Sequence, residues 1–218
     1  MTNGSIVFDL DGTLIDSAPD IHAIANTVLA SQSTQPITLP QARDFIGNGA
    51  GVFVSRMMLA TGLGDDKARH IDMLAQFSEL YKSATALSRL YPGVIDTLGS
   101  LKQAGFQIGL CTNKPIAPTN TVLEHFGLAQ YFDAIAGGDT LRQTKPDPAP
   151  LRHVFDQLGT GTRLYVGDSE VDVQTAENAN VPIALFTEGY RKTPVNELTH
   201  KYLFSNFSEL PGIVQKHF

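Results

Sequence analysis

Two carboxylates near the start of the chain have types and a spacing that could do chemistry. They are Asp9 and Asp11 in the stretch IVFDLDGTLIDS, which runs from Ile6 to Ser17 and places Gly12 directly after them. Residues two apart on a strand point to the same face, so both carboxylates are expected at one point. The two negative charges repel each other unless a hard cation binds between them. Mg²⁺ is such a cation, because it prefers one or two carboxylate ligands and completes its octahedron with water and a substrate phosphate. An aspartate can also attack phosphorus and form an aspartyl-phosphate.

The glycine and threonine that follow these carboxylates admit both a functional and an ordinary structural interpretation. Gly12 lets the backbone turn sharply and leaves its N–H open to an anion, and Thr13 adds a hydroxyl group. A buried strand that ends in an Asp-rich turn would show the same residues, because Asp and Gly are common in turns. For an isolated DxDG pattern the turn is the commoner case, so the rest of the chain has to decide.

The composition describes an ordinary globular protein and argues against several classes of partner. The chain has 218 residues, of which 42% are hydrophobic and 17% charged. Its net charge of −6, without a long Lys/Arg run, speaks against nucleic acid or a membrane surface as a partner. The single cysteine, Cys111, cannot form an internal disulfide, and neither a signal-peptide pattern nor an apolar run of membrane-spanning length is found. We therefore expect a cytoplasmic protein that binds a small molecule, with a monomer and a homodimer both open.

Residues 17–87 show helical patterns and no convincing strand. A first apolar face recurs at helical spacing at Ile21, Ile24, Ala25, Val28 and Leu29. A later helix, capped by Asp65 or Asp66, is expected to carry on its apolar side Ile71, Leu74, Phe77, Leu80 and Tyr81. The segment therefore indicates an all-helical domain.

From Tyr91 onward the patterns alternate between helix and strand. Strands are expected at 108–112, 134–137, 163–166 and 181–186, with helices at 94–104, 118–126, 148–158 and 171–179. This alternation indicates βαβ units and a parallel sheet, which the strand ending at Phe8 can join. The sequence thus predicts a doubly wound, Rossmann-like α/β core of residues 1–16 and 88–218, interrupted after its first strand by a helical cap of residues 17–87.

Polar residues follow four of the predicted strands at the point where each strand ends. Ligands of such sheets bind at the carboxyl ends of the strands, so these residues are expected to meet at one edge. They are Asp9 and Asp11, then Thr112, Asn113 and Lys114, then Lys145, and finally Asp168 and Asp172. Their coincidence at one edge outweighs any single motif and favours the functional interpretation.

Taken together, these segments resemble the haloacid dehalogenase superfamily of aspartate-nucleophile phosphatases. The family pattern is DxDGT, a later Ser/Thr, a Lys and a GDxxxD-like acidic set, and the chain has DLDGT from Asp9, then Thr112, Lys145 and GDSEVD from Gly167. Within the superfamily, the Asp16-Ser17 pair and the stretches 45–50 and 112–114 look most like phosphoglycolate phosphatases. The helical insert looks like the family's mobile cap, with hinges expected near residues 16–18 and 87–91.

The resemblance implies a role for each acidic residue and for the lysine. Asp9 would attack phosphorus and hold Mg²⁺, while Asp11 would protonate the leaving alcohol, then activate water, and ligate the metal through its backbone carbonyl. Asp168 would supply a further metal ligand, and Asp172 would orient the site or ligate through water. Lys145 would neutralise Asp9 and the phosphoryl group.

Other residues are expected to contact the substrate. Thr112, the backbone around Asn113 and the N–H of Gly12 would hold phosphoryl oxygens. The loop 47–49, with Asn48, would reach the site from the cap and meet the leaving group, although a plain helix–helix turn is the alternative. Arg56 could meet a substrate carboxylate or be a surface arginine, two interpretations that we leave open.

Two further residues near the site carry a simpler interpretation. Lys114 is expected to be a solvated loop lysine, with substrate contact as the alternative. Cys111 is expected to be a small core residue.

The resemblance narrows the reaction without fixing the substrate. Asp11 favours phosphate esters, because dehalogenases of the superfamily usually lack an aspartate there. Phosphosugar mutases usually begin the last motif with Glu-Asp, whereas this chain has Gly167-Asp168. Val171 replaces a residue that is polar in many relatives. We expect hydrolysis of a small phosphomonoester, 2-phosphoglycolate first, with a sugar phosphate, a nucleotide or pyrophosphate as rival substrates and a non-catalytic binding protein as a distant alternative.

Overall fold

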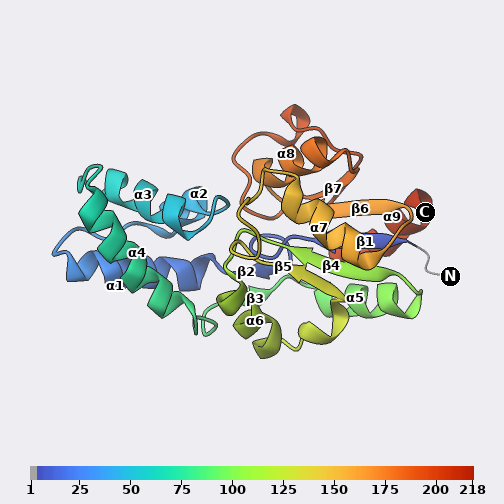
Figure 1. Ribbon diagram of the computed structural model, residues 1–218, viewed down its shortest axis with the longest axis horizontal. Helices are drawn as coiled ribbons and strands as arrows, with labels where there is room; N and C mark the ends of the chain where they lie inside the picture. The colour runs from blue at the N-terminus through green and yellow to red at the C-terminus, as the bar shows by residue number, and fades with distance from the viewer. Residues whose placement is uncertain (1–3) are drawn as a thin grey trace.

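A six-stranded parallel sheet forms the centre of the core. The computed structural model describes residues 4–218, with a helical lobe at one end of an α/β core (Figure 1). The strand order is β5-β4-β1-β6-β7-β8, and each neighbouring pair is parallel. The strands are β1 (Ser5–Phe8), β4 (Gln107–Cys111), β5 (Ala134–Ala136), β6 (Arg163–Gly167), β7 (Ile183–Phe186) and β8 (Tyr202–Phe204). The predicted doubly wound α/β fold is confirmed.

Helices cover both faces of this sheet, which explains why its strands are mainly apolar on both faces. Alternate side chains of β1 enter two separate cores: Ile6 and Phe8 pack on one face and Val7 on the other. The first core is closed by α5 (Val94–Gln103), α6 (Ile116–His125) and α9 (Leu210–His217). The second is closed by α7 (Ala149–Leu158) and α8 (Glu170–Ala179).

The register of the three central strands determines where the polar residues meet. Phe8, the last residue of β1, pairs with Leu110 of β4 and with Val166 of β6. The loops that carry Asp9, Thr112 and Asp168 therefore leave the sheet at nearly the same level. One edge of the core thus collects the residues that the sequence singled out.

The helical lobe has an apolar core of its own. It consists of α1 (Ala18–Ser31), α2 (Leu39–Phe45), α3 (Ala50–Ala60) and α4 (Lys67–Tyr81), which lie together at the left of Figure 1. Asp66 caps α4 by accepting hydrogen bonds from the N–H groups of Ala68 and Arg69. The lobe is all-helical, as expected, and the exact limits 17–87 of a movable cap stay a prediction.

The predicted apolar side of α4 is wrong in part. Ile71 and Leu80 are 66% and 41% exposed, whereas Met73, Phe77 and Tyr81 are buried. These three residues lie at i, i+4 and i+8 and form one stripe against the neighbouring helices. Apolar residues occupy more of the circumference of α4 than its packing partners cover, so periodicity alone could not choose the stripe.

Two short strands connect the lobe to the core. β2 (Ile15–Asp16) pairs antiparallel with β3 (Arg89–Leu90), so both linkers run side by side. Asp20 of α1 is buried and accepts hydrogen bonds from the N–H of Leu87 at 3.1 Å and from the N–H and Oγ of Ser88 at 2.7 and 2.6 Å. The expected hinge segments therefore lie next to each other.

The last part of the chain was not predicted from sequence. It contains β8 and α9 together with two 3₁₀ turns, η2 (Val195–Glu197) and η3 (Phe207–Glu209), while a further turn, η1 (Ala129–Tyr131), precedes β5. Within residues 4–218, no helix combines the length and the apolar character that crossing a bilayer requires.

Candidate active site

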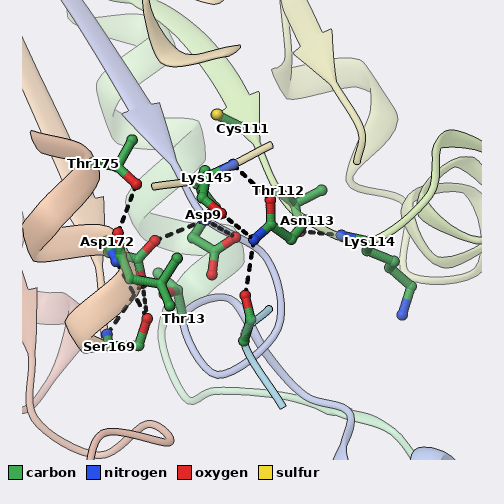
Figure 2. Close-up of polar contacts among 12 residues, drawn as sticks. Asp9, Thr13, Cys111, Thr112, Asn113, Lys114, Lys145, Ser169, Asp172 and Thr175 are labelled. Carbon is green, nitrogen blue, oxygen red and sulfur yellow. Dashed lines mark hydrogen bonds and ion pairs between the residues drawn. The ribbon is translucent and has the colours of Figure 1, made fainter. Parts of the chain in front are cut away.

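Asp9 lies at the carboxyl end of β1 with Lys145 directly beside it. Its N–H donates to Val166 O at 2.9 Å, which ties the start of the loop to β6. Lys145 Nζ lies 2.8 Å from Asp9 Oδ1 and 2.7 Å from Asp172 Oδ1, and both carboxylates and the lysine are buried (Figure 2). The hydroxyl of Tyr165 accepts a hydrogen bond from the same ammonium at 2.9 Å. One lysine therefore bridges two acids at the base of the site.

Asp172 is fully buried and every oxygen of its carboxylate is hydrogen-bonded. Oδ1 accepts from Lys145 and from the Tyr165 hydroxyl at 2.7 Å, and Oδ2 accepts from Ser169 Oγ at 2.6 Å and from the N–H of Asp168 at 3.2 Å. Burial works against its charge, but Lys145 and these hydrogen bonds lower the pKa of Asp172 below its usual value. The geometry makes Asp172 a residue that positions Lys145 and caps α8.

Among the described residues, only neutral groups donate hydrogen bonds to the Asp168 carboxylate. Its Oδ1 accepts from the hydroxyl of Thr13 at 2.6 Å and its Oδ2 from the N–H of Tyr190 at 2.6 Å. Gly12 and Gly189 pack so closely that a Cβ at either position would overlap the Asp168 carboxylate. Gly12 also has φ +89°, so both the turn and the close approach require glycine.

The acidic residues fit a bound cation. Asp9, Asp168 and Asp172 each offer one carboxylate oxygen, and these atoms all lie within 4.8 Å of one another. Burial raises the pKa of Asp9 to about 7. The charges of Asp172 and Asp11 act in the same direction, whereas Lys145 opposes the shift. Burial and the neighbouring carboxylates also raise the pKa of Asp168 well above its usual value. Lys145 thus leaves negative charge uncompensated, and oxygen ligands of this kind suit a hard divalent cation.

Asp11 points to a different part of the site. Its Oδ1 accepts from Ser17 Oγ at 2.6 Å and lies 3.2 Å from Lys114 Nζ. The expectation that Lys114 is solvated is wrong, because Lys114 is only 4% exposed and donates to the hydroxyl of Tyr81 at 2.7 Å. Tyr81 comes from the end of α4, so the lobe covers a lysine that its position in a core loop would otherwise expose.

The loop after β4 connects the phosphate side of the site to the lobe. Asn113 Nδ2 donates to Gly47 O at 2.9 Å and to Lys145 O at 3.0 Å, and its Oδ1 accepts from the N–H of Lys145 at 2.9 Å. Thr112 is buried, with its Oγ1 accepting from the N–H of Lys114 at 3.1 Å. This leaves the Thr112 hydroxyl proton available to a substrate oxygen. Cys111 is buried as expected, and burial raises the pKa of its thiol to about 12.

The expected anion donor in the first loop is wrong. Gly12 N–H donates to Ile15 O at 2.8 Å inside the turn and is not open to an anion. Within residues 4–218, the backbone N–H groups of Leu10 and Asp11 donate to no protein acceptor. A phosphoryl oxygen near Asp9 would therefore meet these two donors of the same loop instead.

A cavity between core and lobe contains these residues. Its core side includes Asp9, Asp11, Thr112, Asn113, Lys114 and Lys145, and its lobe side includes Ile21, Ile46, Gly47, Phe53, Phe77 and Tyr81. Asn48 and Arg56 are not among the lining residues: the Arg56 guanidinium donates to Asn48 Oδ1 at 2.9 Å and to Phe45 O at 3.0 Å. Arg56 thus braces the loop before α3, and substrate contact by either residue stays a prediction.

Sequence reasoning missed several partners of the acidic residues, among them two tyrosines and a serine. Tyr165 and Tyr190 hydrogen-bond to Asp172 and Asp168, and Ser17 to Asp11. Tyr165 stands in an apolar strand and Tyr190 in an irregular loop, so neither gave a local signal for its contact.

Comparison with known proteins agrees with this arrangement. Residues 6–186 match the family model described as haloacid dehalogenase-like hydrolase. Proteins named phosphoglycolate phosphatase from Cereibacter sphaeroides (strain ATCC 17025) and Rhodobacter capsulatus are 49% and 43% identical, over 96% and 97% of this chain and 97% and 96% of theirs. A crystal structure described as a predicted phosphoglycolate phosphatase from Haemophilus somnus is 30% identical, with a TM-score of 0.91 over 97% of both chains. The chain belongs to the haloacid dehalogenase-like hydrolase family.

Proposed function

We propose that this protein is a Mg²⁺-dependent phosphatase that hydrolyses 2-phosphoglycolate through an aspartyl-phosphate on Asp9. The observation that carries the proposal is the buried Asp9 carboxylate, 2.8 Å from Lys145 Nζ and beside Asp168, at the base of a cavity. The names of the relatives supply the substrate. We further propose that the protein works in the cytoplasm as a monomer or homodimer.

The chain's own residues account for both halves of the reaction. Asp9 attacks phosphorus while the bond from phosphorus to the leaving oxygen breaks, and Asp11 gives its proton to that oxygen. In the second half, Asp11 takes a proton from the water that attacks phosphorus, and Asp9 is released. Lys145 and the hydroxyl of Thr112 stabilise the phosphoryl oxygens, since phosphoryl transfer depends mainly on positioning and charge.

The acidic cluster would hold the metal ion. Asp9 and Asp168 would bind Mg²⁺ with the backbone carbonyl of Asp11, and Asp172 would support them through Lys145 and the start of α8. When bound, Mg²⁺ supplies positive charge to the phosphoryl oxygens and to the acidic cluster.

The helical lobe would exclude water during the reaction. Its apolar wall faces Asp9 and Asp11 across the cavity, and its two linkers are paired as β2 and β3. We propose that this ribbon is the hinge at which the lobe opens for substrate and closes for catalysis.

The test is phosphate release from a panel of phosphate esters, with Mg²⁺ and with EDTA. We expect Mg²⁺-dependent turnover with 2-phosphoglycolate ahead of sugar phosphates, nucleotides and pyrophosphate. Asp9→Asn should reduce kcat by at least about a thousandfold, because the nucleophile is lost. Asp156→Asn, which changes an exposed acid outside the cavity lining, is the control. Phosphate release that survives Asp9→Asn would refute the nucleophile, and a preference for another ester would refute the substrate.

A further inference from the structure

Lys114 is a buried cation on the cavity wall that the reaction described above does not use. Besides Lys145, it is the only lysine, arginine or histidine among the described residues that line the cavity. Lys145 is already shared between Asp9 and Asp172. A second anionic group on a substrate therefore has one cationic partner available, and that partner is Lys114.

The contacts of Lys114 leave room for one more acceptor. Its ammonium donates to Asp11 Oδ1 at 3.2 Å and to the Tyr81 hydroxyl at 2.7 Å, and Nζ lies 4.1 Å from the centre of the Tyr81 ring. A lysine ammonium has three N–H donors, so one remains for an anion in the cavity. The hydroxyl group and the aromatic ring of Tyr81 hold the long Lys114 side chain in one position. Less side-chain entropy is therefore lost when an anion binds to it.

The position of Lys114 matches the leaving-group end of the substrate. Figure 2 shows Thr112, Asn113 and Lys114 on one loop, with the Lys114 side chain running away from Asp9, Lys145 and Asp172. Phosphorus must lie at Asp9 and the leaving oxygen at Asp11. In 2-phosphoglycolate one methylene separates the leaving oxygen from the carboxylate, so the carboxylate lies just beyond Asp11. The ammonium 3.2 Å from Asp11 is where that group would arrive.

The apolar side chains around Lys114 would strengthen an ion pair between its ammonium and a substrate carboxylate. Phe53, Phe77 and Ile21 line the lobe side of the cavity, and an apolar wall that excludes water strengthens a charge pair. Arg56, the other candidate for a carboxylate, is held by Phe45 O and Asn48 outside the cavity lining.

Resting on the proposed phosphatase activity, we infer that Lys114 binds the substrate's carboxylate and thereby selects phosphate esters of short hydroxy acids. Because Tyr81 belongs to the lobe and Lys114 to the core, the carboxylate site is complete only when the two parts are together. Recognition of the acid is thereby coupled to the arrangement in which water is excluded.

The first test compares substrates with and without the acid. We expect Lys114→Met to lower kcat/KM for 2-phosphoglycolate about 100-fold more than that for ethyl phosphate, because a weakened Asp11 would affect both esters while only the acid loses its buried partner. The loss should fall mainly on KM. Lys82→Met, at an exposed lysine one residue after α4, and Arg56→Met should keep the wild-type preference for the acid.

The second test measures binding without turnover, by calorimetry in the presence of Mg²⁺. The phosphonate 3-phosphonopropionate keeps the carboxylate, whereas propylphosphonate lacks it. Wild-type protein should bind the acid about 100-fold more tightly, and Lys114→Met should bind both phosphonates nearly equally. Propylphosphonate binding by Lys114→Met also shows that the variant is folded.

The outcomes separate this inference from the proposed function. An equal loss on both ligands would reject carboxylate binding and leave Lys114 as a support for Asp11. An unchanged preference in Lys114→Met, or a wild-type protein that does not distinguish the two phosphonates, would also overturn it. Selective binding of 3-phosphonopropionate that depends on Lys114, in a protein without phosphatase activity, would support the inference and refute the proposed function.

Discussion

Replacing Tyr165 by Phe tests whether the site depends on the hydrogen bonds beneath it. The hydroxyl is fully buried, donates to Asp172 Oδ1 at 2.7 Å and accepts from Lys145 Nζ at 2.9 Å. The variant keeps the ring and both ion pairs of Lys145, and it loses two hydrogen bonds to charged groups together with a longer contact of 3.4 Å to Cys111 O. Such bonds contribute roughly 1.5–3 kcal/mol each, and because the Lys145–Asp172 ion pair still satisfies both charged partners, we expect a net loss about the size of one such bond.

Chemical denaturation and steady-state kinetics measure this effect. We expect Tyr165→Phe to lower the free energy of unfolding by about 1.5–3 kcal/mol. For a chain of this length that is a fall in Tm of about 3–12 °C. Because Lys145 is less firmly held, kcat should fall about three- to thirtyfold with KM nearly unchanged. Tyr202→Phe is the matched control, because within the described part of the chain its hydroxyl makes only a 3.4 Å contact with His217. A loss below about 0.5 kcal/mol with unchanged kcat would refute the reasoning.

Three further predictions concern the proposed metal site. Gly12→Ala should destabilise the protein more than Gly62→Ala does, because both positions have positive φ but only Gly12 packs against Asp168. Denaturation midpoints of the two variants measure this difference, and equal losses of stability would contradict the close approach of Gly12 to Asp168. Mg²⁺ should bind more weakly at pH 6 than at pH 8, by about tenfold per unit below the Asp9 pKa of about 7, since a proton competes with the metal there. Titration of Tm with Mg²⁺ measures this, and equal affinity at both pH values would refute it. Asp168→Asn should raise the free energy of unfolding in EDTA at pH 7 by about 0.5–2 kcal/mol and should abolish stabilisation by Mg²⁺. The pKa of Asp168 is higher in the folded protein than in the unfolded chain, so the ionised acid destabilises the folded state at any pH above the unfolded pKa. A variant less stable than wild type in EDTA would contradict that assignment.

The convergence of Asp9, Lys145, Asp168 and Asp172 could be predicted because one rule connects sequence order to space. Parallel strands place their carboxyl ends at one edge of the sheet, and the in-register pairing of β1 with β4 and β6 brings the loops to one level. Each of these residues directly follows a recognisable apolar strand or lies in the connection after one. Local patterns were therefore sufficient for the core of the site.

What the sequence could not reveal depends on contacts between distant parts of the chain. Lys114 is buried because Tyr81 of the lobe covers it, and no local pattern near Lys114 contains that fact. The two-residue strands β2 and β3 are too short to show a period. The apolar stripe of α4 was misassigned for the same reason, since only the packed neighbours decide that Ile71 faces solvent.

The distribution of charge explains how two lysines and the proposed cation would share one site. Lys145 stands between Asp9 and Asp172, and Lys114 stands against Asp11, so each buried ammonium is matched with an acid. When all four carboxylates are ionised, the two ammonium groups leave two negative charges, and Asp168 has only neutral donors among the described residues. A divalent cation would balance these two remaining charges before substrate enters, and it would do so at Asp168, which has no ionic partner within residues 4–218. A substrate that carries a phosphate and a carboxylate would then find the cation and Lys145 at one end and Lys114 at the other.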